Sequence, residues 1–131
     1  MGNGGVVINV ASVSATVDFP GVAACSAAKA AVDRLTRSAA LESGKLGYGV
    51  RVNCVHPGFI PTTAYRRSSE DAMGTGDFAS VYDATGNAAD NAPTDSFDDT
   101  SQIGTTVVYL ASDAARLVTG AVLPVDGGLQ T

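Results

Sequence analysis

The chain has 131 residues, of which 45% are hydrophobic, and eight Lys and Arg against thirteen Asp and Glu give it a net charge of −5. This length suits one domain, and the hydrophobic content is typical of a folded chain rather than a disordered one. The acidic balance argues against a nucleic-acid partner, which needs clustered positive charge, and no apolar run approaches the roughly 20 residues that span a bilayer.

The first predicted strand covers residues 6–11, where a β-branched run follows a glycine cluster. Residues 23–43 predict a helix because they contain eight alanines and few β-branched residues, and Gly44 is a plausible stop. One apolar stripe at helical spacing should mark the buried face of this helix. The stripe consists of Ala24, Ala28, Val32, Leu35 and Ala39.

Residues 50–55 predict a second strand that ends at His56-Pro57-Gly58. A second helix is predicted from about residue 100 to about 115, and a third strand follows Gly120. Apolar strands without alternation, separated by helices, indicate an α/β fold with a parallel sheet.

The least ordered-looking part is 64–98, and eight acidic residues fall within 70–99 without any Lys or Arg. We interpret this region as a solvated, mobile loop, with an acidic metal or partner site as the alternative. The spacing of the acids does not match a calcium loop, so no metal is expected. Cys25 and Cys54 have no CxxC spacing and no secretory signal is visible, which favours reduced thiols in a cytoplasmic protein.

Four segments together resemble the C-terminal half of a short-chain dehydrogenase/reductase: GGVVINVAS, CSAAKAAVDRLTRSAALE, GVRVNCVHPGFIPT and YLASDAARLVTGAVLPVDGG. They occur in the family's order and cover nearly the whole chain outside 64–98. The resemblance implies one truncated Rossmann-like domain over residues 1–131. Its partial parallel sheet would have about three strands, equivalent to strands five to seven of the family, with flanking helices and a variable substrate loop at 64–98.

The resemblance also implies a site for an oxidoreductase that uses NAD or NADP on small carbonyl or alcohol substrates. The family's substrate-binding serine falls on Ser12, and its ribose-binding lysine falls on Lys29. The position of the catalytic tyrosine, between these two, holds Cys25. The family segment that contacts the nicotinamide end of the cofactor falls on Pro57, Gly58, Ile60 and Thr62.

Two departures from the family bear on activity. The tyrosine is absent, and no glycine-rich strand-to-helix turn exists to hold a pyrophosphate. We therefore expect poor cofactor affinity and impaired or lost redox activity. The alternatives are a non-catalytic remnant that acts through oligomerisation, and a hydrolase with Cys25 as nucleophile.

Cys25 and Lys29 stand at positions i and i+4 and should share one helix face, where the ammonium would favour a thiolate. The sulfur is nevertheless too close to the backbone to replace a tyrosine hydroxyl. Three interpretations remain for Cys25: a small apolar residue, a reactive thiol, or residual acid–base chemistry through a water. His56 stands in an ordinary sequence context for the family, and we expect a structural role for it.

A three-stranded sheet of this kind would leave the edge of its first strand and some apolar sheet surface open. We therefore expect a homo-oligomer, with the 23–43 helix as its interface.

Overall fold

A computed structural model of the chain describes residues 4–19, 21–60, 62–74 and 100–130. Its centre is a parallel sheet in the order β1-β2-β3, which confirms the predicted fold class. Val10 lies beside Val55 and Pro57 beside Val125, so the three strands end at one edge of the sheet, the carboxyl edge. The strands are β1 (Gly5–Val10), β2 (Val50–Pro57) and β3 (Val122–Val125).

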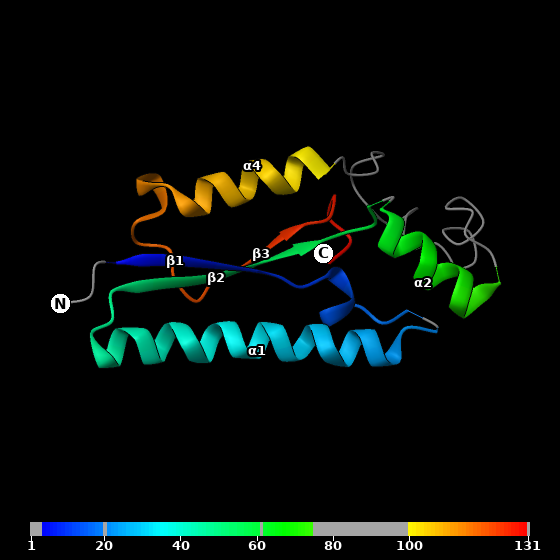
Figure 1. Cartoon of the computed structure of the whole chain (residues 1–131), viewed down its shortest axis with the longest axis horizontal. Coiled ribbons are helices and arrows are strands. Elements are labelled where there is room, and N and C mark those ends of the chain that lie inside the picture. Colours follow the sequence, from blue (N-terminus) through cyan, green and yellow to red (C-terminus); the bar gives the residue numbers. More distant parts are fainter. Residues whose placement is uncertain (1–3, 20, 61, 75–99, 131) are drawn as a thin grey trace.

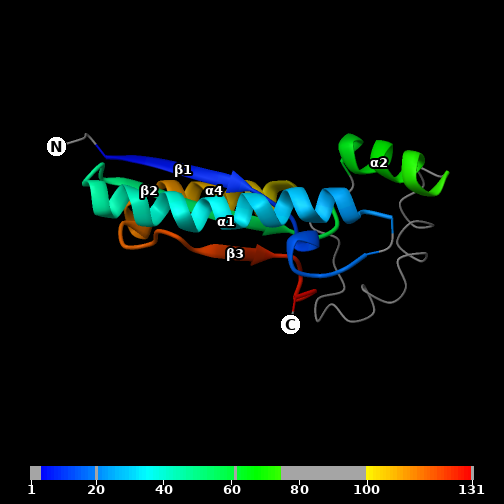
Figure 2. The same ribbon diagram turned by 90° about the horizontal axis from the view of Figure 1, so that it is seen from below.

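Helices cover both faces of this sheet. Helix α1 (Ala23–Leu46) lies on one face and helix α4 (Thr100–Ala111) on the other (Figure 1 and Figure 2). Helix α2 (Thr63–Met73) lies beyond the carboxyl edge. No helix in the described ranges has the length and apolarity that a bilayer crossing demands.

The core is centred on β2, which has a neighbouring strand on each side. Val52, Cys54 and Val55 are buried there, together with Leu110 from α4 and Ala40 from α1. Residues 52–56 are buried without a break, so both faces of β2 are covered, and the polar Asn53 and His56 are buried with their apolar neighbours.

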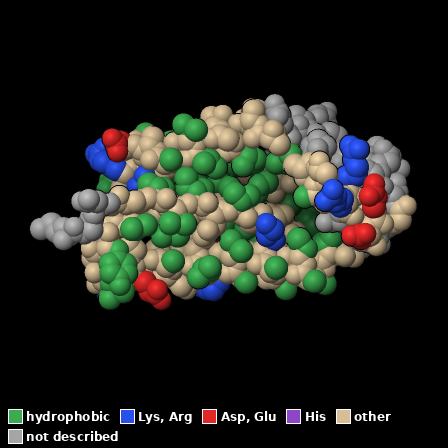
Figure 3. Space-filling model, in the orientation of Figure 1, with side chains coloured by type: hydrophobic (Ala, Val, Ile, Leu, Met, Phe, Trp, Pro, Cys, Tyr) green, Lys and Arg blue, Asp and Glu red, His purple; other side chains and the backbone are tan. Residues whose placement is uncertain are grey.

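β1 is less well covered because it is an edge strand. Its Val6, Val7 and Val10 are 38%, 44% and 50% exposed. Figure 3 shows hydrophobic side chains gathered along the middle of the molecule, between α4 and α1. Part of the apolar surface of the sheet is therefore open to solvent.

The predicted end of the first helix was wrong. Gly44 lies inside α1, which continues to Leu46. The helix ends at Gly47, whose φ of 70° is left-handed and whose N–H donates to the carbonyl of Ser43. A residue with φ in this region is most often glycine. Gly47 has the left-handed φ that ends a helix, whereas Gly44 lies inside α1 and is not among the glycines with positive φ.

The predicted buried stripe of α1 was also largely wrong, because Ala24, Ala28 and Leu35 are exposed. The residues that α1 buries are Thr36, Ala40 and Ser43. Thr36 accepts a hydrogen bond from Asn9 on β1 at 2.9 Å, and the Ser43 hydroxyl both donates to and accepts from the backbone of Val50. Polar side chains that have hydrogen-bond partners of this kind can be buried without the usual desolvation cost. A hydropathy pattern does not indicate such partners.

Helix α2 forms where no element was predicted. Its start is capped by the Thr62 hydroxyl, which accepts from the Tyr65 N–H at 3.2 Å, and its end by Gly74 with a left-handed φ of 72°. The remainder of the predicted loop, residues 75–99, lies outside the described part. The second predicted helix ends as α4 at Ala111, followed by the 3-10 turn η2 (Asp113–Ala115).

Candidate active site

Ser12 lies at the carboxyl edge of the sheet, two residues after the end of β1. Its hydroxyl accepts the Ser14 N–H at 3.2 Å and caps the 3-10 turn η1 (Val13–Ala15). The side chain is half-buried. Ser12 thus has a local structural role at the position where the family resemblance places the substrate-binding serine.

Lys29 reaches the same corner from α1. Its ammonium donates to the carbonyl oxygen of Val10 at 3.1 Å, so its charge is held at the end of β1, two residues before Ser12. The fold therefore brings together two of the predicted site residues that are seventeen positions apart in the sequence.

Cys25 lies one helical turn before Lys29, nearer the start of α1, and it is exposed. The spacing i, i+4 puts both side chains on one face of the helix. Cys54, in contrast, is fully buried in β2, and burial raises the pKa of its thiol. The exposed thiol of the candidate site is therefore that of Cys25.

The second group of predicted site residues follows β2 at the same edge. The N–H of Gly58 donates to the carbonyl of Val125 at 3.0 Å, which continues the β2–β3 pairing. A Cβ added to Gly58 would lie 2.8 Å from the Cα of Asp126. Glycine is thus required here by the close approach of two backbones. Thr62 has its hydroxyl occupied as the cap of α2, and Ile60 accepts the Thr62 N–H through its carbonyl.

An aromatic cluster, which sequence reasoning missed, joins the two strand-to-helix connections. Phe19 packs edge-on against Phe59 with ring centroids 5.2 Å apart, and Phe59 packs against Tyr65 at 6.0 Å. Contacts of this geometry are favourable beyond their buried area. Phe59 sits inside the segment that the family resemblance singles out, but nothing in the sequence indicated that Phe19 would meet it.

His56 lies in the core of the sheet, and the structural role expected from its sequence context stays a prediction. It is completely buried in β2, and neither ring nitrogen has a hydrogen-bond partner in the described part of the chain. Burial lowers its pKa, and the carboxylate of Asp33, 3.8 Å from its Nε2, acts in the opposite direction. A fully buried imidazole is not placed to serve the exposed thiol of Cys25.

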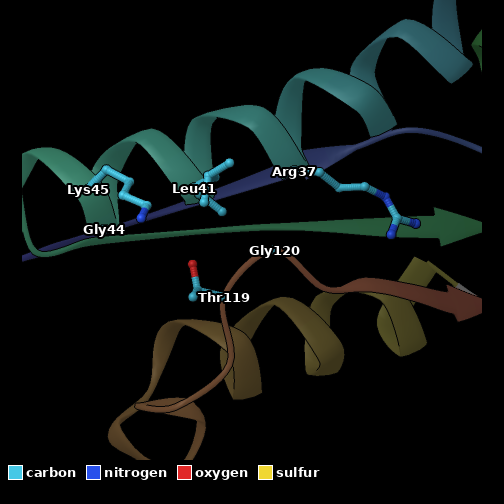
Figure 4. Close-up of a pocket in the computed structure, with 7 residues that line it drawn as sticks. Arg37, Leu41, Gly44, Lys45, Thr119 and Gly120 are labelled. Carbon is cyan, nitrogen blue, oxygen red and sulfur yellow. The ribbon is translucent and has the colours of Figure 1, made fainter.

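A hollow of about 610 Å³ lies elsewhere, between α1 and the segment that enters β3 (Figure 4). Arg37, Leu41 and Lys45 border it from the helix, and Thr119 and Gly120 from the other side. Gly120 bonds to Val52 near the beginning of β2, so the hollow is at the opposite end of the sheet from Ser12. It does not belong to the candidate site. Within the described ranges, no three His, Cys, Asp or Glu side chains gather as metal ligands.

Comparisons with known proteins by family model, by sequence and by structure agree with one another. The family model described as enoyl-(acyl carrier protein) reductase matches residues 1–130. The NADP-dependent (R)-specific alcohol dehydrogenase of Lentilactobacillus kefiri is 36% identical over 97% of this chain and 46% of its own length. Levodione reductase superposes with a TM-score of 0.78 at 31% identity, over 95% of this chain and 46% of that structure. A 4-hydroxyisoleucine dehydrogenase complexed with NADH gives 0.73 at 32% identity, with 95% and 46% covered.

These matches place the fold in one class, that of the Rossmann-like short-chain dehydrogenases/reductases. The chain belongs to the short-chain dehydrogenase/reductase family. It spans less than half the length of the curated relatives that it matches, between 41% for one and 47% for another.

This chain offers residues for only part of the nicotinamide dinucleotide that the family implies. Lys29 and Pro57 lie at the carboxyl edge, where an α/β sheet binds its ligands, and Thr62 begins α2 just beyond it. A pyrophosphate needs a glycine-rich turn between a strand and a helix. The two such connections among the described strands, 11–22 and 58–62, contain one glycine each, and Gly58 is packed against Asp126. The residues described here do not by themselves fit the whole dinucleotide.

Proposed function

We propose that this chain carries the substrate-side residues of a short-chain oxidoreductase whose carbonyl or alcohol chemistry is impaired or lost. The observation that carries the proposal is the Lys29 ammonium held 3.1 Å from the Val10 carbonyl, beside Ser12. This corner has the residues that the family uses around the substrate oxygen, except that Cys25 stands at the tyrosine position. NAD or NADP would be the cofactor, and a small ketone or alcohol the substrate.

The expected loss of activity follows from the short length of the Cys25 side chain rather than from the acidity of its thiol. Proton transfer requires the donor and acceptor atoms to lie roughly 2.6–3.2 Å apart. The sulfur of Cys25 is bonded directly to Cβ, whereas a tyrosine hydroxyl lies at the far side of an aromatic ring. A substrate oxygen positioned for tyrosine would therefore be out of reach of the thiol.

The experiment compares the wild-type chain with Cys25→Tyr and with Cys25→Phe, which supplies the ring without the hydroxyl. Binding of NADH and NADPH is titrated by fluorescence, and reduction of a panel of small ketones is followed by absorbance. Because weak cofactor binding is expected, the assays use cofactor in large excess, and under these conditions we expect turnover only in Cys25→Tyr. If neither wild type nor Cys25→Tyr binds a nicotinamide cofactor, the redox proposal fails for this chain. Equal turnover by wild type and Cys25→Tyr would show that Cys25 does not limit activity.

One observation favours a second candidate. Cys25 is the exposed thiol and shares a helix face with an ammonium, an arrangement that suits nucleophilic chemistry. In this alternative the chain is a hydrolase, with Cys25 as nucleophile activated by Lys29. Hydrolysis of p-nitrophenyl acetate that disappears in Cys25→Ser, and not in Cys54→Ser, would support it.

A non-catalytic chain that acts through oligomerisation is the remaining alternative. The exposed Ala24, Ala28 and Leu35 of α1 give the helix an apolar face that a homo-oligomer could cover. Sedimentation that finds only a monomer over a wide concentration range would exclude this alternative.

A further inference from the structure

The turn that follows β3 reaches across the carboxyl edge of the sheet to η1. The hydroxyl of Thr16, the residue that ends η1, donates to the side-chain oxygen of Gln130 at 2.6 Å, although the two residues are 114 positions apart. In Figure 2 the red segment after β3 accordingly lies beside the blue connection from β1 to α1. Gln130 therefore joins two segments that no strand pairing connects.

The turn that carries Gln130 is itself held in place. The Oδ1 of Asp126 accepts the Gly128 N–H at 2.9 Å, and the Asp126 carbonyl accepts the Leu129 N–H at 3.3 Å. The backbone of Asp126 also packs closely on Gly58, where an added Cβ would lie 2.8 Å from the Asp126 Cα. The position of Gln130 is thus set by the exit of β2.

The Gln130 amide also lies near a buried imidazole. Its nitrogen is buried, as are both ring nitrogens of His56, and none of the three makes a hydrogen bond of regular geometry to another described residue. Burial lowers the pKa of His56, and the Gln130 side chain is among the groups that act in the opposite direction, which places it beside the ring. Because buried polar atoms are nearly always hydrogen-bonded, these two neighbours are the natural partners for each other.

An amide can bond to both neighbours at once. It has one end that donates and one end that accepts, whereas a hydroxyl or a neutral imidazole can do either. One end of the Gln130 amide can therefore bond to the Thr16 hydroxyl while the other bonds to a ring nitrogen of His56. This holds for both orientations of the amide.

Thr16 in turn controls the geometry of η1. Its N–H donates to the Val13 carbonyl at 3.0 Å, and its hydroxyl lies 3.1 Å from the same oxygen. At the other end of η1, the Ser12 hydroxyl accepts the Ser14 N–H at 3.2 Å. This bond uses only a lone pair of the Ser12 oxygen, so the hydroxyl proton stays free to be donated to another group.

We infer that Gln130 is a positioning residue, which joins His56 in the core to Thr16 and so fixes η1 and the Ser12 hydroxyl at the carboxyl edge. The role of Ser12 at a substrate oxygen rests on the proposed function, whereas the connection through Gln130 does not. It would give a residue in a surface connection, where backbone is generally more mobile, a position set by the buried part of β2.

The test is NMR spectroscopy of the 131-residue chain, with hydrogen exchange measured at the Ser14 N–H and ¹⁵N shifts measured for the His56 ring. Gln130→Ala should accelerate exchange at Ser14 at least about tenfold and shift a ring nitrogen of His56, because both bonds of the amide are lost. Thr16→Val should accelerate the same exchange but leave the ring nitrogens unchanged. The double variant should exchange no faster than the faster of the two single variants, since both changes break one connection.

Two further variants separate this connection from a general loss of stability. Gln130→Glu keeps the length of the side chain and two acceptor oxygens, so it should restore slow exchange at Ser14. Gln102→Ala makes the matched change at an exposed glutamine of α4 and should alter neither readout. Circular dichroism should report native helix content in every variant.

Wild-type exchange at Ser14 in Gln130→Ala would overturn the inference, and so would additive effects of Gln130→Ala and Thr16→Val. Unchanged ring nitrogens in Gln130→Ala would show that His56 is not the second partner and would overturn it equally. None of these measurements needs a cofactor or turnover, so a failure of the redox proposal would leave their outcome unaffected.

Discussion

Replacement of Gly58 by alanine should destabilise the fold by about 2 kcal/mol. The new Cβ would lie 2.8 Å from the Cα of Asp126, 3.1 Å from its Cβ and 3.3 Å from its carbonyl oxygen. Non-bonded carbon atoms normally approach to about 3.5–4.0 Å. The exit of β2 and the exit of β3 would therefore have to separate by several tenths of an ångström or more.

The magnitude follows from two opposing effects. Overpacking of a well-packed site costs about 1–3 kcal/mol, and a clash with backbone belongs near the upper limit because no rotamer can relieve it. Alanine also restricts the unfolded chain more than glycine does, which restores about 0.4–1 kcal/mol. The net loss is about 2 kcal/mol, a substantial part of the stability of a small domain.

Urea denaturation followed by circular dichroism measures this loss, and Gly44→Ala provides the matched control. Gly44 lies inside α1 with no atom within 4 Å of the position of a Cβ. Its replacement should therefore stabilise the chain by about 0.5–1 kcal/mol. Wild-type stability in Gly58→Ala would refute the packing reason given for Gly58, and destabilisation by Gly44→Ala would refute the placement of Gly44 within the helix.

Three further predictions follow from burial and hydrogen bonding. Burial lowers the pKa of His56, so the unfolded chain takes up a proton before the folded chain does, and stability should fall as the pH drops below about 6.5. The slope cannot exceed about 1.4 kcal/mol per pH unit for one proton, and urea midpoints measured between pH 5 and pH 7 should depend less on pH in His56→Phe. Cys25 should react promptly with a thiol reagent in the native chain, whereas Cys54 should react only in denaturant; prompt labelling that persists in Cys25→Ser would contradict this. Arg51→Met should cost about 2 kcal/mol by urea denaturation, because its guanidinium donates to the carbonyl of Leu110 at 2.7 Å and to other carbonyls at the end of α4. Arg51→Lys should recover only part of that loss, since an ammonium cannot reproduce the planar fork of donors.

The strands were predictable from the sequence because their signals are local. Each is a short run, rich in apolar residues, that follows a glycine, and the structure contains β1, β2 and β3 at or within a few residues of the predicted positions. The parallel arrangement also followed, because helical segments connect the apolar runs that form the strands.

The buried face of α1 was not predictable in the same way. Thr36 and Ser43 are polar, and their burial depends on partners supplied by Asn9 and Val50. Similarly, the family resemblance predicted Gly58 as a cofactor contact, but only the structure shows its approach to Asp126. The contact between Phe19 and Phe59 joins segments forty residues apart, and no local pattern encodes it. Features of this kind depend on the tertiary fold.

The double hydrogen bond between Ser43 and Val50 has a consequence for the order of folding. It joins residues only seven positions apart and closes the turn from α1 into β2, so little chain entropy opposes its formation. β1 pairs with residues about 45 positions away and must close a much longer loop. The α1–β2 unit should therefore be formed in the transition state before β1 joins it. In stopped-flow measurements Ser43→Ala would then slow folding, whereas Val7→Ala would mainly accelerate unfolding.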